Sequence, residues 1–190
     1  MKTKYIWIIF TTFIICSCEK DDNSNENLSK NPPETPEAVS YDLNDDSVND
    51  IKIEYRWFTW DGINSSGDGI SGLIEPLNES SILLKQNEYT LFNKLNDTIR
   101  INTTEPYYWE KYLAPAFVSI SNSSVNDYLW PSEWKIQSNL NLDSYYLGIV
   151  INNSNNNLIG WIKITINKST GDVQILDKKF TTEEFIVIEK

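Results

Sequence analysis

The sequence contains no histidine and only two cysteines, Cys16 and Cys18. Histidine is the commonest general base and the commonest ligand of transition metals, so its absence excludes a serine or cysteine nucleophile activated by histidine. Because no cysteine follows residue 18, the rest of the chain has no thiol for a disulfide, a redox motif or a zinc site. A glycine-rich phosphate loop and an HExxH motif are also absent. Catalysis, if present, depends on carboxylates.

Basic residues are few: 16 Lys and Arg stand against 27 Asp and Glu, which gives a formal net charge of −11. Binding of nucleic acid requires clustered Lys and Arg against the phosphates, so we expect no nucleic-acid partner. Only Arg56 and Arg100 could bind an anion with two parallel hydrogen bonds, and either could equally be a surface strand residue.

A long apolar run occurs at the N-terminus, where Lys2 and Lys4 precede YIWIIFTTFII. This run has the length of a signal peptide and is too short to span a bilayer comfortably. It ends in ICSC, followed by EKDD. An apolar stretch, a small residue and a cysteine resemble a bacterial lipobox, which makes residues 1–17 the leader and Cys18 the lipidated residue. An uncleaved anchor and an ordinary secretory signal are the alternatives.

The acidic start SCEKDD also resembles the surface-export signal of lipoproteins in the Bacteroidetes group. This resemblance implies an outer-membrane protein that faces the cell exterior and contacts the membrane through the lipid on Cys18. Residues 18–40 are polar and contain Pro32, Pro33 and Pro36, with few aliphatic side chains to bury. Such a composition predicts a disordered tether between the lipid and a domain that starts at residue 41.

Residues 41–190 contain short runs rich in Ile, Val, Tyr and Trp, separated by Asn, Ser, Gly and Asp clusters. This pattern predicts an all-β fold, an antiparallel β-sandwich of jelly-roll or immunoglobulin-like type. NNSNNN and KSTGD each link two strands as hairpin loops, and Gly171 is suited to a positive φ there. Alternation places Ile162, Ile164 and Ile166 in the core, with Trp161 on the opposite face of a central strand.

Two segments carry a second resemblance, a DxNxDxxxD loop followed by a strand near Asp42, and YLG followed by GWI near the C-terminus. They resemble the opening and closing segments of a group of secreted bacterial β domains that has no settled activity. The similarity covers residues 42–55 and 145–180 and leaves the middle of the chain unmatched. It implies fold and location, and it says little about function.

The same acidic loop, DLNDDSVND, places oxygen side chains at alternating positions of a turn. Calcium takes six to eight oxygen ligands, and this spacing also resembles the calcium loops of integrin-type propeller repeats. The predicted calcium ligands are the side chains of Asp42, Asn44, Asp46 and Asp50 and the carbonyl of Val48. Such loops usually have glycine at the position of Ser47, so we expect strain of about 1 kcal/mol there. The alternative is a turn that only solubilises the entrance to a strand.

Aromatic residues cluster at WFTW (57–60), at YYW (107–109) and around Trp130. Trp109, Trp130 and Trp134 could form a platform on which a sugar stacks, although aromatic residues in strands are more often core. Four acidic residues could supply a carboxylate pair for glycoside hydrolysis: Glu105, Glu110, Glu133 and Asp143. Because no catalytic set is recognisable, we expect a non-catalytic module that binds a glycan or a surface protein. A polysaccharide hydrolase that depends on carboxylates is the alternative.

Overall fold

The structure is a computed structural model, and it describes residues 28–86, 92–138, 140, 142–153 and 156–189. These residues form twelve strands and one 3-10 turn, η1 (Ser124–Asn126). The strands are β1 (Val39–Tyr41), β2 (Ile51–Asp61), β3 (Ser66–Pro76), β4 (Ser81–Lys85), β5 (Thr98–Arg100), β6 (Tyr107–Glu110), β7 (Ala116–Ser121), β8 (Lys135–Ile136), β9 (Tyr145–Asn153), β10 (Asn156–Ile166), β11 (Val173–Thr181) and β12 (Phe185–Val187).

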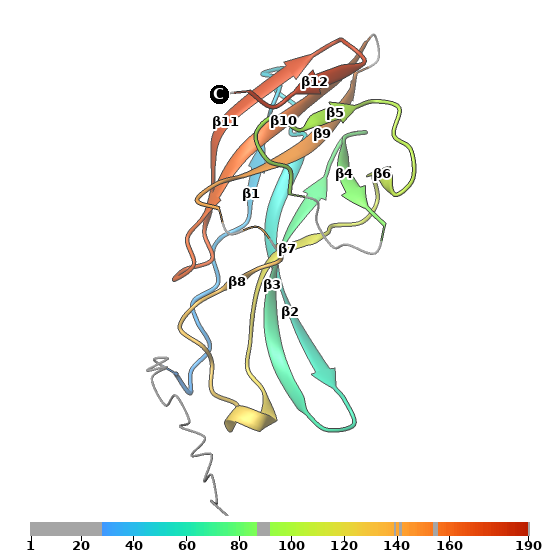
Figure 1. Cartoon of the computed structure of the whole chain (residues 1–190). Helices are drawn as coiled ribbons and strands as arrows, with labels where there is room; N and C mark the ends of the chain where they lie inside the picture. The colour runs from blue at the N-terminus through green and yellow to red at the C-terminus, as the bar shows by residue number, and fades with distance from the viewer. Residues whose placement is uncertain (1–27, 87–91, 139, 141, 154–155, 190) are drawn as a thin grey trace, which may run out of the picture.

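The strands build two five-stranded antiparallel sheets that pack together, as Figure 1 shows. The first sheet has the order β1-β2-β3-β7-β8 and the second the order β11-β10-β9-β4-β6. A separate antiparallel ribbon pairs β12 with β5. The predicted antiparallel β-sandwich is therefore confirmed.

The second sheet buries both of its faces, and the alternation along β10 shows how. Ile162, Ile164 and Ile166 are buried in the main core between the two sheets. Trp161 points the other way, into a smaller core that also contains Ile99 of β5 and Ile186 of β12. The predicted assignment of these β10 residues to opposite faces is confirmed, and the β5–β12 ribbon is what covers Trp161.

The closing hairpins follow the predicted turns. β9 pairs with β10 from Tyr145 onward, and β10 pairs with β11, so the three strands form an antiparallel meander. Gly171 has φ 81° in the loop between β10 and β11, in the left-handed region that favours glycine. The expected turn around NNSNNN falls partly on residues 154–155, which lie outside the described residues.

The N-terminal segment requires a correction. The domain was expected to start at residue 41, but Ser29 and Trp130 exchange two backbone hydrogen bonds, 2.9 and 2.7 Å long. β1 begins at Val39 and pairs with β2. Backbone pairing and partial burial of Pro33 and Pro36 hold residues 28–40 against the sandwich, although their side chains offer little to a core. The leader, Cys18 and the remaining tether lie outside the described residues.

Candidate functional site

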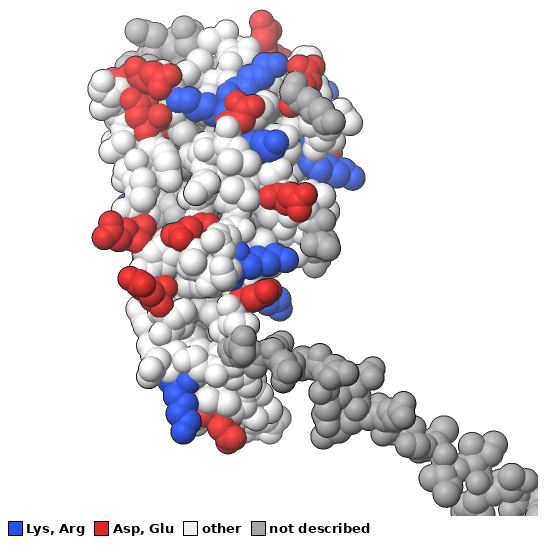
Figure 2. Space-filling view, turned by 90° about the vertical axis from the view of Figure 1, so that its left-hand side faces the viewer, with Lys and Arg blue, Asp and Glu red and all other residues white. Residues whose placement is uncertain are grey.

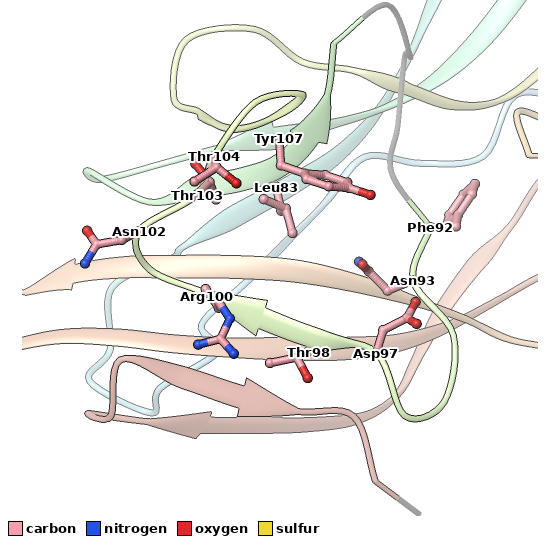
Figure 3. A pocket seen from close by; sticks show the side chains of 10 residues that line it. All are labelled: Leu83, Phe92, Asn93, Asp97, Thr98, Arg100, Asn102, Thr103, Thr104 and Tyr107. Atoms are coloured by element: carbon pink, nitrogen blue, oxygen red, sulfur yellow. The ribbon is translucent and has the colours of Figure 1, made fainter.

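A cleft of about 380 Å³ opens beside β5, and we call it the β5 cleft (Figure 3). Its lining comes from β4, from the segment before and along β5, and from the segment that leads into β6. The residues are Leu83, Phe92, Asn93, Asp97, Thr98, Arg100, Asn102, Thr103, Thr104 and Tyr107. Figure 3 shows Tyr107 on one side of the cleft and β5 on the other.

Burial of Ile99 orients the two polar side chains of β5. Ile99 has no exposed surface, and alternation along a strand turns Thr98 and Arg100 outward. The guanidinium of Arg100 lies over the ring of Phe185 on β12, with its carbon 5.2 Å from the ring centroid. This cation–π contact steadies the side chain while its N–H groups stay accessible.

Asp97 and Asn93 shape the end of the β5 cleft where β5 begins. The carboxylate of Asp97 accepts a hydrogen bond from the backbone N–H of Lys94 at 2.9 Å, which closes the turn before β5. Asn93 is 7% exposed, and its backbone N–H donates to the carbonyl of Tyr146 at 2.8 Å. The cleft therefore combines a fixed cation, one carboxylate, amide and hydroxyl groups, and a phenol ring.

Among the described residues that line the cleft, Asp97 is the one acidic residue, whereas glycoside hydrolysis uses two carboxylates. The four acidic residues considered from the sequence do not gather there. Glu110 accepts from the backbone N–H groups of Tyr112 and Leu113 at 2.7 and 3.0 Å, so it closes the turn after β6. Glu133 lines a different cleft beside Trp134.

The acidic loop between β1 and β2 curls around the carboxylate of Asp42. That carboxylate accepts backbone N–H groups of Asn44 (3.2 Å), Asp45 (2.7 Å), Asp46 (3.2 Å) and Ser47 (2.7 Å). Limited desolvation acts to raise the pKa of Asp42, but these hydrogen bonds together outweigh it and hold the pKa below its ordinary value. Asp45 and Ser47 have φ values of 63° and 71°, so the expected left-handed conformation at Ser47 is confirmed.

Hydrogen bonds within the loop also involve Asn44, Asp46 and Asp50. The amide of Asn44 donates to the carboxylate of Asp46 at 2.9 Å, and Asp50 is 2% exposed and accepts from the N–H of Leu43 at 2.7 Å. Burial, and then the charges of Asp46 and Asp42, raise the pKa of Asp50. Among the described residues, no group of three or more Asp, Glu, His or Cys side chains has the arrangement of a metal site.

The structure separates the three tryptophans of the expected sugar platform. Trp130 and Trp134 are 4% and 2% exposed and belong to the main core, where Trp134 packs edge-on against Tyr55. Trp109 packs on the smaller core, and its indole N–H donates to the carbonyl of Ile101 at 2.8 Å. Because they are buried, Trp130 and Trp134 offer no free ring face on which a sugar could stack. Burial of such large rings stabilises the fold.

Sequence reasoning did not identify the β5 cleft, although it named Arg100 and, within the YYW cluster, Tyr107. Arg100 was one of two arginines considered for an anion, and the other, Arg56, forms an ion pair with Glu54 on β2. The alternation of TIR around Ile99 was the available signal that Arg100 is accessible. All of the lining residues lie between Leu83 and Tyr107, but the turns that bring β4, β5 and β6 together around the cleft are not evident from the sequence.

Comparisons of the chain with protein-family models, with curated proteins and with solved structures give no match. No helix within the described residues is long and apolar enough to cross a membrane. The site must therefore be interpreted from its own chemistry, which is that of a polar cleft with one accessible arginine.

Proposed function

We propose that this protein is a lipid-anchored, non-catalytic binding module of the bacterial outer membrane, exposed to the exterior, and that the β5 cleft binds an acidic carbohydrate. The observation that carries the proposal is the position of Arg100 among amide and hydroxyl groups, with Asp97 as the one described carboxylate, and opposite the ring of Tyr107, which is 43% exposed. An aromatic face suits the C–H groups of a sugar ring, and a guanidinium suits a carboxylate with two hydrogen bonds.

The volume of the β5 cleft agrees with a small ligand. At about 380 Å³ it lies within the range of about 300–1,000 Å³ that small-molecule sites occupy. Asn102, Thr103 and Thr104 supply donors and acceptors for sugar hydroxyls. Asp97 is the single carboxylate among the described lining residues, which supports binding over hydrolysis.

We expect Arg100→Lys to weaken binding of an acidic oligosaccharide about 10- to 100-fold, because lysine keeps the charge but loses the planar pair of donors. The measurement is titration calorimetry with an oligogalacturonate and with its neutral galactose counterpart, chosen after a glycan array. Arg56→Lys, a matched change on β2 outside the cleft lining, should leave the affinity unchanged. Equal binding of neutral and acidic sugars, unaffected by Arg100→Lys, contradicts the proposal.

We further propose that the acidic loop binds calcium through Asp42, Asn44, Asp46, Asp50 and the Val48 carbonyl. Three of the loop N–H groups donate to Asp42 Oδ1, whereas Oδ2 accepts only from Ser47, so Oδ2 keeps a lone pair for a cation. Three carboxylates, those of Asp42, Asp46 and the 2% exposed Asp50, belong to one loop of nine residues, where a positive charge would offset their mutual repulsion. Calcium would supply that charge and hold the loop against the entrance of β2.

We expect calcium to stabilise the folded protein by about 2.7 kcal/mol at a hundredfold excess over Kd, and magnesium to do so poorly. Asp46→Ala should remove this stabilisation, because it removes the ligand oxygens, whereas Asp45→Asn tolerates the positive φ at a position that is no predicted ligand and should retain it. Thermal melts in calcium and in chelator measure the effect. If the unmodified protein melts at the same temperature in calcium and in chelator, the loop is a turn without a calcium site.

A further inference from the structure

The far end of the β2–β3 hairpin carries apolar side chains that the sandwich does not use. β1 pairs only with the first residues of β2, up to Ile53, and β7 pairs with β3 between Gly69 and Leu73. Beyond those pairings the hairpin continues to a loop whose Ile63 is 102% exposed. The apolar tip, as we define it, consists of Trp57, Phe58 and Ile63 of the hairpin with Val125 and Tyr128 around η1, all exposed.

Hydrogen bonds and ring contacts make these side chains one end of the molecule. The hydroxyl groups of Ser66 and Tyr128 lie 3.2 Å apart, and the N–H of Ser66 donates to the hydroxyl of Ser124 at 3.1 Å. Trp57 packs edge-on against Trp130, with ring centroids 5.7 Å apart. In Figure 1 the hairpin loop and η1 lie together at the lower end, away from β5 and β6, which line the β5 cleft.

The described chain begins at this same end. Ser29 is hydrogen-bonded through its backbone to Trp130, the residue against which Trp57 packs. Leu28 follows Cys18 by ten residues, which can span at most about 35 Å. From Trp57 to Ile63 the hairpin extends by about 20 Å at the rise of a β-strand. A lipid on Cys18 would therefore keep the tip within reach of the bilayer.

The charge distribution favours the same orientation. Figure 2 shows charged side chains spread over the upper and middle parts of this face, while the lower end is largely white apart from a basic and an acidic side chain at the bottom. The hairpin loop and η1 still contain Asp61 and Asp127. Burying a carboxylate in the hydrocarbon of a membrane is costly, whereas the headgroup region tolerates it. These carboxylates therefore limit how deeply the tip can enter the membrane, to the interface where Trp and Tyr side chains are favoured.

We propose that the apolar tip rests in the headgroup region of the membrane that holds the lipid anchor, which turns the β5 cleft away from the bilayer. This inference depends on the proposed lipidation of Cys18. The bilayer then contacts the protein twice, through a short acyl-linked segment and through the tip. Two weak contacts joined by a short linker reinforce each other, because the second forms at a high effective concentration.

The test uses the protein extracted from membranes and reconstituted into vesicles of phosphatidylcholine, with and without brominated acyl chains. Bromine quenches nearby tryptophan, and Trp57 is 54% exposed at the tip while Trp130, Trp134 and Trp161 are buried. Trp60 lies nearer the hairpin loop and is half-buried, so it is expected to respond as well. We expect brominated lipid to quench the emission, Trp57→Phe combined with Trp60→Phe to remove most of that quenching, and Ile63→Ser with Val125→Ser to reduce it. Leu176→Ser, at a 51% exposed position of β11, is the matched control and should leave it unchanged.

Intact-mass measurement of the extracted protein shows whether Cys18 carries acyl chains. The proposed lipidation is therefore tested separately from the proposed contact between the tip and the membrane. A lipidated protein whose emission is the same in both kinds of vesicle overturns the proposal. A second result would also overturn it: the unmodified protein forms a dimer in detergent, Ile63→Ser with Val125→Ser disrupts that dimer, and brominated lipid does not quench the emission. The tip would then bind a second copy of the chain. Ile63 and Val125 are too exposed for these substitutions to unfold the domain.

Discussion

Replacement of Trp161 by alanine is expected to lower the free energy of unfolding by about 3–5 kcal/mol. Trp161 is 3% exposed and packs edge-on against Tyr146, with ring centroids 5.3 Å apart. It belongs to the core that joins the second sheet to Ile99 and Ile186 of the β5–β12 ribbon. Its loss leaves a cavity under that ribbon, so Thr98 and Arg100 lose their fixed position in the β5 cleft.

Chemical denaturation measures the stability, and titration with the acidic oligosaccharide measures the function of the folded variant. The variant Trp161→Phe keeps an aromatic ring at this position and removes the indole N–H together with part of the ring. The indole N–H of Trp161 has no hydrogen-bond partner among the described residues, so phenylalanine loses only contact area and should cost about 1–2 kcal/mol. A folded Trp161→Ala protein with unchanged affinity would show that the ribbon does not depend on this core.

Period-two alternation was sufficient to predict how β10 is buried. Ile162 and Ile164 occupy one face and Trp161 the other, because successive side chains of a strand point to opposite sides. Alternation also places Thr98 and Arg100 outside Ile99. The local chemistry of Asp and Asn was equally informative for the acidic loop, where the expected positive φ at Ser47 is present. These features depend on residues close together in the sequence.

Features that depend on distant residues could not be predicted. Trp130 is buried because Ser29 and Trp57 lie against it, and neither contact leaves a trace in the sequence around Trp130. The polar segment 28–40 was assigned to the tether for its composition, but backbone hydrogen bonds and strand pairing hold it irrespective of apolar content. The β5 cleft is different, because its lining residues all lie between Leu83 and Tyr107; what the sequence did not show is how the chain turns to bring β4, β5 and β6 around it.

The last prediction concerns Gly160, which lies on β10 between Ile149 of β9 and Phe180 of β11. A Cβ atom at Gly160 would lie 2.3 Å from the backbone oxygen of Lys179 and 2.3 Å from the ring of Phe180. The ring can rotate, but the backbone oxygen can move only if β10 and β11 separate. Gly160→Ala should therefore lower the free energy of unfolding by about 3 kcal/mol, at the upper end of the usual cost of overpacking.

Two other glycines supply the comparison. At Gly69 a Cβ atom would lie 2.1 Å from the ring of Phe58, but that side chain is 37% exposed near the apolar tip and can move aside. We expect Gly69→Ala to cost about 1 kcal/mol. At Gly62 the nearest atom is 3.2 Å away, in an exposed loop, so alanine should be nearly neutral. Urea denaturation of the three variants measures the order, and it should be Gly160, Gly69, Gly62. A Gly69→Ala variant as unstable as Gly160→Ala would contradict the argument, because rotation of an exposed ring would then be as costly as separating two central strands.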